Sequence, residues 1–147
     1  MEIERKFLIR EMPANLEDYP HRTLEQGYLC VEPVVRVRKD ADKYELTYKS
    51  KGLMIREEKN LPLTQEAYEH LSQKIDGRLI TKERYCIPFQ EKYTIELDIF
   101  KGDLAPLVLA EVEFETEEQA ISFLPPDWFG EEVTACPDYH NSVLSQK

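Results

Sequence analysis

The sequence has no run of 18 consecutive apolar residues, and it has no glycine-rich phosphate-binding loop of the Walker type. The first absence argues against a membrane-spanning helix. The second means that any bound phosphate group must be held by side chains. Only three cysteines occur, Cys30, Cys86 and Cys136, and their spacing includes no C-x-x-C pair. An odd number without that spacing argues against a disulfide framework and against a zinc site.

Positive charge is also scarce, because 19 Lys and Arg residues stand against 29 Asp and Glu residues, for a net charge of −10. Such a surface would repel nucleic acid and anionic lipid. The first residues include Glu2, Glu4, Arg5 and Lys6, where a signal peptide would need an apolar core. We therefore expect a cytosolic monomer or homodimer without nucleic-acid or membrane partners. The length of 147 residues predicts one domain over residues 1–147.

Short runs of alternating polar and apolar residues follow one another, separated by turn residues such as Pro33, Gly52 and Gly102. This pattern predicts eight strands, at residues 1–9, 23–31, 34–39, 43–51, 55–61, 79–87, 92–99 and 107–115. Helices are predicted at residues 64–75, 116–124 and 138–146, with one further turn within 12–18. The expected fold is mainly β, an eight-stranded antiparallel closed barrel with a few peripheral helices. The lumen of such a barrel can hold side chains or one small ligand.

The charged residues of these strands form rows of largely one sign, since side chains two positions apart share a face of a strand. Acids occupy positions 2/4, 96/98 and 111/113, and cations occupy 36/38, 49/51 and 82/84. Antiparallel strands commonly expose one polar face, so alternation alone would indicate only a surface. Surface rows, however, usually mix uncharged polar residues with charges of both signs. Helices also need apolar sheet surface to pack on, so the apolar faces can point outward and the charged rows can line the lumen.

A lumen with this lining requires a ligand. Carboxylates about 4 Å apart repel each other by roughly 4 kcal/mol at an effective dielectric constant near 20, so they need a cation between them. Hard divalent cations are bound by such carboxylate oxygens. The Arg and Lys rows favour a dense anion, because guanidinium groups match phosphate oxygens bidentately. The combination predicts a site for a metal ion and a polyphosphate.

Eight short motifs of the sequence resemble, in order, those of the CYTH superfamily, the triphosphate tunnel metalloenzymes. They are EIERK at residues 2–6, RVR at 36–38, YKSKG at 48–52, R-x-E at 56–58, KERY at 82–85, ELDIF at 96–100, EVEF at 111–114 and GEEVT at 130–134. The family fold is an eight-stranded antiparallel barrel that encloses a tunnel. The resemblance implies cleavage of a phosphoanhydride bond with Mg²⁺ or Mn²⁺, in which one ion bridges phosphate oxygens and a second, where present, activates the attacking water.

The resemblance also implies which residues form the site. The metal-site carboxylates would be Glu2, Glu4, Glu111 and Glu113, with Glu58 and Asp98 as further contributors. The phosphate chain would be held by Lys6, Arg36, Arg38, Lys49, Arg56, Lys82 and Arg84. Lys6, Arg38 and Glu113 are the candidate catalytic residues. Asn60 departs from the R-x-E-x-E form of many family members, which leaves Glu58 as the better ligand candidate on its strand.

The compact length and the GEEVT motif resemble the bacterial inorganic triphosphatases, so hydrolysis of inorganic triphosphate to pyrophosphate and phosphate is the leading hypothesis. A class IV adenylate cyclase, a thiamine triphosphatase and a non-catalytic polyphosphate-binding module are the alternatives. A lipocalin-like carrier is disfavoured, because it would line its lumen with apolar side chains. The residues His21, His70 and His140 are expected at the surface, and Tyr28, Trp128 and Phe129 are expected to serve packing rather than recognition of a base.

Overall fold

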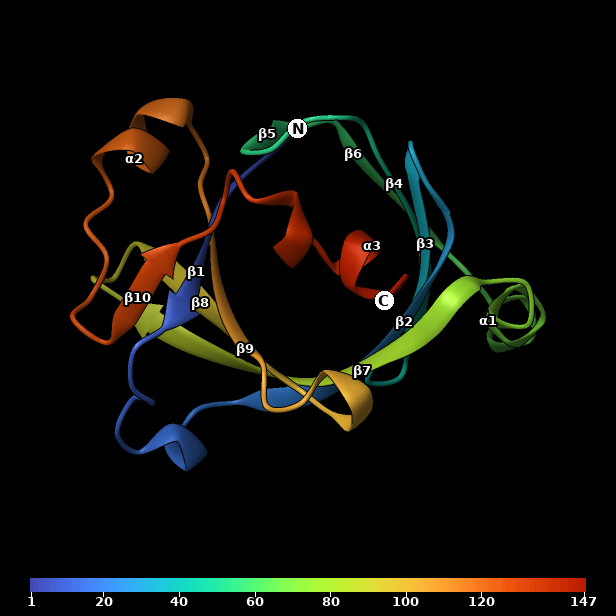
Figure 1. Ribbon diagram of the computed structural model, residues 1–147, viewed down its shortest axis with the longest axis horizontal. Coiled ribbons are helices and arrows are strands. Elements are labelled where there is room, and N and C mark those ends of the chain that lie inside the picture. Colours follow the sequence, from blue (N-terminus) through green and yellow to red (C-terminus); the bar gives the residue numbers. More distant parts are fainter.

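The computed structural model describes residues 1–147, and its strands form one antiparallel sheet that curls into a ring (Figure 1). The sheet order is β10-β1-β9-β8-β7-β2-β3-β4-β6, and β5 pairs with β1. This confirms the predicted mainly β, antiparallel barrel. The strands are β1 (Glu2–Ile9), β2 (His21–Val31), β3 (Val34–Asp40), β4 (Lys43–Lys49), β5 (Ile55–Arg56), β6 (Glu58–Pro62), β7 (Asp76–Phe89), β8 (Tyr93–Phe100), β9 (Val108–Glu113) and β10 (Phe129–Glu132).

The ring closes where the chain changes its pairing partner at Glu57. The sequence predicted one strand over residues 55–61, but the structure has two: β5 pairs with β1, and β6 pairs with β4. The Ser50 hydroxyl accepts the Glu57 N–H at 2.9 Å, and the Ser50 N–H donates to the Glu57 carbonyl at 3.0 Å. The tight loop before β5 depends on Gly52, whose φ is 141° and where an added Cβ would lie 2.3 Å from the Ile55 carbonyl oxygen. The segment predicted as one strand, residues 55–61, therefore connects β4 at one end of the sheet to β1 near the other end.

Other elements differ from the expected ones in length and number. Strand β10, which contains part of the GEEVT motif, was not predicted. It pairs with the second half of β1, whereas β5 pairs with the first two residues of β1. The predicted helices are shorter than expected: α1 is Gln65–Ser72, α2 is Glu117–Ser122 and α3 is Asn141–Leu144. Thr64 and Thr116 cap α1 and α2 through their hydroxyl groups, as their positions before each helix predict. Three short 3₁₀ helices lie at Leu16–Asp18, Gly102–Leu104 and Pro137–Tyr139.

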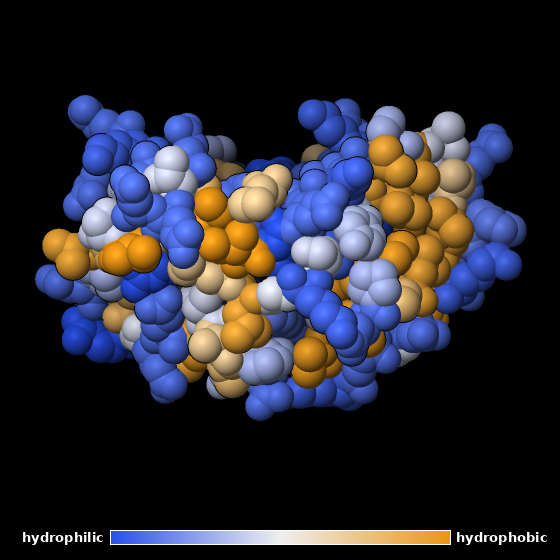
Figure 2. Space-filling model, turned by 90° about the horizontal axis from the view of Figure 1, so that it is seen from above, coloured by the Kyte–Doolittle hydropathy of each residue, from blue (hydrophilic) through white to orange (hydrophobic).

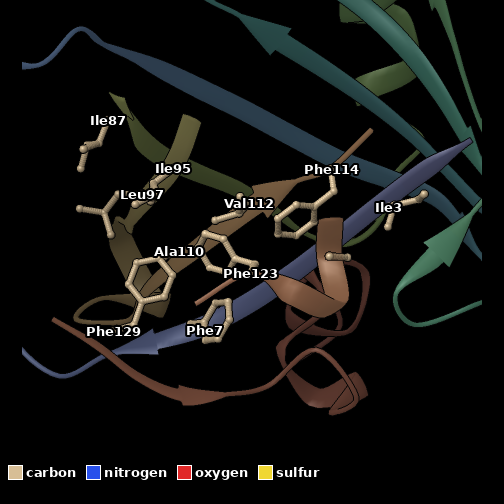
Figure 3. Packing of buried hydrophobic residues seen from close by; sticks show 11 residues of the cluster. Ile3, Phe7, Ile87, Ile95, Leu97, Ala110, Val112, Phe114, Phe123 and Phe129 are labelled. Atoms are coloured by element: carbon tan, nitrogen blue, oxygen red, sulfur yellow. The ribbon is translucent and has the colours of Figure 1, made fainter. Parts of the chain in front are cut away.

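The larger hydrophobic core lies outside the ring, between the sheet and the segment that carries α2. Figure 3 shows Phe7 of β1, Phe123 after α2 and Phe129 of β10 turned toward one another, and the rings of Phe7 and Phe129 are 4.7 Å apart. The outward residues Leu97 of β8 and Val112 of β9 are fully buried in the same cluster. The apolar faces of these strands thus point outward under α2, as predicted, which leaves their charged faces toward the lumen.

The outer surface is only partly covered by helices. The face seen in Figure 2 is mostly hydrophilic, with separate hydrophobic areas. Ile121 and Leu124, on and just after α2, are 71% and 78% exposed. None of the helices combines the length and the apolar character that crossing a bilayer requires.

Candidate functional site

The barrel encloses a cavity of about 220 Å³, and only two of its 21 lining residues, Tyr28 and Val34, are hydrophobic. A cavity of this size is large enough for a small ligand but too polar to stay empty of water or ions. The structure brings nearly all sequence-predicted site residues together here. Those that line the cavity are Glu2, Glu4, Lys6, Arg36, Arg38, Lys49, Arg56, Glu58, Lys82, Arg84, Glu111 and Glu113.

The strand registers explain how these residues meet. Lys6 of β1 stands opposite Glu111 of β9, and Lys49 of β4 stands opposite Glu58 of β6. Directly opposed side chains on one face of an antiparallel pair lie about 5 Å apart at their Cβ atoms, within reach of an ion pair. The Lys6 ammonium is 3.6 Å from a Glu111 carboxylate oxygen. Because side chains alternate between the two faces of each strand, the acidic and basic residues of neighbouring strands lie together in the cavity.

Acidic residues predominate on the side of the cavity formed by β1, β5, β6 and the end of β9. The Lys49 ammonium lies 3.1 Å from Glu2 and 3.3 Å from Glu58, so one cation serves two carboxylates. Burial, opposed by the Lys49 charge, raises the pKa of Glu2 to about 7, and its Oε1 atom is buried without a hydrogen-bond partner. Burial also raises the pKa of Glu4 well above its usual range, with added repulsion from Glu111 and Glu2. This side therefore holds more buried carboxylate than the local cations neutralise.

Cationic residues predominate on the side formed by β2, β3 and β7. Arg36, Arg38, Lys82 and Arg84 are all at least nine-tenths buried. Burial, together with the neighbouring Arg84 and Arg38 charges, lowers the pKa of Lys82 to about 7 against the attraction of Asp98. The Arg36 Nε atom is buried and has no hydrogen-bond partner. Guanidinium and ammonium groups crowded in this way, with donors left free, make a receptor for a multivalent anion.

Asp98 does not take the place that the resemblance implied for it. It is fully buried and does not line the cavity. Its two oxygens accept hydrogen bonds from Arg84 Nε and Nη2 at 2.7 and 2.9 Å, and the Lys82 ammonium lies 2.7 Å away. These two cations, acting against burial, lower its pKa. Both oxygens are engaged by cations in this structure, so Asp98 positions Lys82 and Arg84, and its part in metal binding stays a prediction.

Several lining residues were missed from the sequence. Arg22 shares the inward face of β2 with Gln26 and Tyr28, and the alternation in HRTLEQGY could have indicated it. His140, which was expected at the surface, is half-buried in the cavity lining. Burial and the Lys6 charge lower its pKa to about 4. No sequence pattern marks His140 or its neighbour Asn141, because they enter the lumen from the end of the chain and not from a strand.

The donor set suits a hard cation, although no three His, Cys, Asp or Glu side chains are already gathered around one point. The carboxylates of Glu2, Glu4 and Glu58 instead face the lumen's own cations, with Arg56 3.6 Å from Glu2 and 3.9 Å from Glu4. Glu2 Oε1 has no hydrogen-bond partner, and burial raises the pKa values of Glu2 and Glu4, so a bound cation would stabilise the charged form of both carboxylates. Oxygen donors in this number fit Mg²⁺ or Mn²⁺, both of which prefer carboxylates.

Comparison with known proteins extends over nearly the whole chain. A family model of the CYTH domain matches residues 1–135. The inorganic triphosphatase of Nitrosomonas europaea is 40% identical over 98% of this chain and 96% of its own length. That of Acetivibrio thermocellus is 39% identical over 97% of this chain and 92% of its own length.

Solved structures agree with this result. The crystal structure of an inorganic triphosphatase superposes with a TM-score of 0.74 at 37% sequence identity, covering 100% of this chain and 95% of the other. A Hippeastrum protein with a dominant triphosphatase activity is only 15% identical, with a TM-score of 0.64 over 82% of this chain and 83% of its own. The second likeness supports the fold alone.

Proposed function

The chain belongs to the CYTH domain family, and from that premise we propose that it is an inorganic triphosphatase, which cleaves triphosphate to pyrophosphate and phosphate inside the barrel. One observation carries the proposal: a single cavity inside the barrel holds buried cations on one side and mostly buried carboxylates on the other. The first suits the phosphate chain and the second suits the metal ion that accompanies it. Two inorganic triphosphatases of about 40% identity support the same reaction.

The phosphate chain is held by side chains and not by a backbone loop. We assign this role to residues whose ammonium or guanidinium groups line the cavity: Lys6, Arg36, Arg38, Lys49, Arg56, Lys82 and Arg84. Lys6 lies between the two walls, 3.6 Å from Glu111 and 3.1 Å from the Tyr139 carbonyl, to which it donates. We assign Lys6, with Arg38, to the phosphate that is released, where positive charge would stabilise the transition state.

The metal ion is assigned to the carboxylates that line the cavity, Glu2, Glu4, Glu58, Glu111 and Glu113. A bound Mg²⁺ or Mn²⁺ would neutralise phosphate oxygens and activate the attacking water. Glu113 is the exposed member of this set, and burial of its inner part together with the Glu58 and Glu96 charges raises its pKa. That position at the cavity edge suits a carboxylate that orients water entering from solvent.

The small number of aromatic side chains in the cavity lining bears on the choice of substrate. Tyr28 and His140 are the only ring-bearing side chains among the 21 lining residues. A nucleobase would need a stacking surface in addition to hydrogen bonds to its edges, and the remaining lining supplies no aromatic surface for stacking. We infer that inorganic triphosphate is preferred over ATP and thiamine triphosphate, and that the whole chain, residues 1–147, acts as one domain in the cytosol. Whether it acts as a monomer or a homodimer stays a prediction.

One experiment tests the proposal. Purified protein is incubated with inorganic triphosphate, ATP and thiamine triphosphate, each with Mg²⁺, with Mn²⁺ and with excess chelator. We expect release of phosphate and pyrophosphate from triphosphate, with kcat/KM at least tenfold above that for ATP, a gap of about 1.4 kcal/mol in transition-state binding. Cyclic AMP from ATP would indicate a cyclase instead. Tight binding without hydrolysis would indicate a binding module, and full activity in chelator would refute the metal requirement.

A further inference from the structure

The cavity is closed at one end, because the inward-facing rows of four strands change from charged to apolar residues there. On each strand the charged residue and the apolar one are two positions apart. The pairs are Lys6 and Leu8 on β1, Lys82 and Ile80 on β7, Asp98 and Phe100 on β8, and Glu111 and Leu109 on β9. The apolar residues at these positions are Leu8, Ile80, Phe100 and Leu109, and they pack together with Leu144 of α3. Figure 1 shows α3 and the preceding turn inside the ring of strands. We call residues 137–146, which fill this end, the C-terminal plug.

The C-terminal plug is fixed to the barrel by its own contacts. The Arg78 N–H donates to the Ser145 carbonyl at 2.7 Å, and the Gln146 side chain donates to the Asp76 carbonyl at 3.3 Å. A Cβ at Gly77 would lie 2.2 Å from the Ser145 carbonyl oxygen, so the chain approaches β7 as closely as glycine permits. The plug therefore presents the same side chains to the cavity in a defined position.

Asn141 is the plug residue that joins the cationic wall. Its Oδ1 atom accepts a hydrogen bond from the Lys82 ammonium at 3.0 Å and another from Gln26 Nε2 at 3.3 Å. Gln26 is fully buried, and its Oε1 atom accepts a hydrogen bond from Arg38 Nε at 2.8 Å. Asn141 thus contacts Lys82 directly and Arg38 through Gln26.

The Lys82 contacts show what Asn141 contributes. Asp98 attracts the ammonium from one side at 2.7 Å, and the Phe100 ring lies 5.3 Å from it. Asn141 lines the cavity and draws the same ammonium toward it. Without the Asn141 oxygen, only the buried carboxylate of Asp98 would hold Lys82, and the ammonium would turn away from the bound phosphate.

We propose that Asn141 is a positioning residue for triphosphate binding, which orients Lys82 directly and Arg38 through Gln26. The proposal rests on the proposed function, since it assigns the anion to the same cavity. In this proposal the C-terminal plug covers one end of the barrel and also contributes a residue to the phosphate-binding side of the cavity.

The test measures triphosphate binding by calorimetry for the wild type and for Asn141→Ala, in excess chelator, where the proposed metal requirement prevents hydrolysis. We expect the variant to bind about tenfold more weakly, with a higher KM and a smaller change in kcat when Mg²⁺ is restored. Asp138→Ala is the matched control, because it changes an exposed plug residue that does not line the cavity, and it should bind like the wild type. If Asn141→Ala does not fold, Asn141→Ser also removes the amide oxygen while keeping a polar group at the start of α3.

A double-mutant cycle with Lys82→Ala separates positioning from a purely structural role. If Asn141 acts largely through Lys82, the tenfold loss should shrink to about threefold in the Lys82→Ala background, leaving the part that passes through Gln26 to Arg38. An undiminished loss in that background, or wild-type affinity of Asn141→Ala, would overturn the proposal. Hydrolysis by the wild-type protein is assayed separately, so its absence would refute the proposed function without deciding the role of Asn141.

Discussion

Glu4 of β1 and Glu113 of β9 face each other across the antiparallel ladder as a like-charged pair. Directly opposed like charges destabilise a sheet, so a protein retains them where another group uses them. Two residues along the same ladder, Glu111 is opposed by Lys6 and forms an ion pair with it. The two acids of the EVEF motif therefore have opposite electrostatic surroundings, although the sequence presents them as equivalent.

This difference predicts opposite effects of two similar substitutions on the metal-free protein. Glu113→Gln should raise the free energy of unfolding, because burial and neighbouring acids disfavour its charge. Glu111→Gln should lower it, because Lys6 and Arg84 outweigh burial and hold the Glu111 pKa well below its usual range. Denaturant unfolding in chelator measures both. Each variant should also lose roughly 100-fold or more of its metal-supported triphosphate turnover, since even residues that only hydrogen-bond a metal ligand are worth about 10- to 100-fold. Normal turnover in both would place EVEF outside the site.

The pH dependence of stability in the metal-free protein should reveal Glu2. Its folded-state pKa of about 7 lies above the ordinary value of 4.5, so the folded state binds this proton more tightly than the unfolded state does. Its contribution to stability is present below pH 4.5 and is lost as the pH rises through 7. His140 has the opposite slope in an overlapping range, since its lowered pKa of about 4 costs stability as the pH falls below 6.5.

The comparison that isolates Glu2 is the difference in unfolding free energy between Glu2→Gln and the wild type. We expect this difference to grow in favour of the variant by about 3 kcal/mol between pH 4.5 and 7. Saturating Mg²⁺ should stabilise the wild type and remove most of the effect, because the cation takes the place of the proton. A difference that does not change with pH in chelator would show that burial does not disfavour the charged form of Glu2.

The sequence allowed the barrel and most of the cavity lining to be predicted, because both follow from the period of 2 along each strand. Lys82, Arg84 and Asp98 show where that reasoning stops. Alternation predicts that they share the inner side, but only the packed structure shows that Asp98 is covered by the other two. The partner change at Glu57 and the entry of His140 into the lumen depend on contacts between distant segments, which no local pattern records.

Substitution of Asp98 distinguishes a positioning role from metal binding. Asp98→Asn leaves Lys82 and Arg84 as buried cations without their carboxylate, and breaking a buried ion pair costs roughly 3–5 kcal/mol. We therefore expect a large loss of unfolding free energy, measured by denaturant titration, with and without Mg²⁺. If Asp98 were a ligand, the metal-free variant would keep its stability while the Mg²⁺ concentration needed for half-maximal activity rose. Stability that matches the wild type in chelator would restore Asp98 as a metal-ligand candidate.

Arg36 provides the test of the cationic wall. Its Nη2 atom donates to Thr47 at 3.0 Å, its buried Nε atom has no hydrogen-bond partner, and the side chain lines the cavity. Arg36→Ala should raise KM for triphosphate about tenfold, the effect of losing ~1.4 kcal/mol of binding, while the Mg²⁺ dependence stays close to that of the wild type. Lys39→Ala is the matched control, since Lys39 carries the same charge on the same strand but is exposed. If both variants behaved alike in steady-state kinetics, net charge and not the lumen geometry would explain the binding of triphosphate.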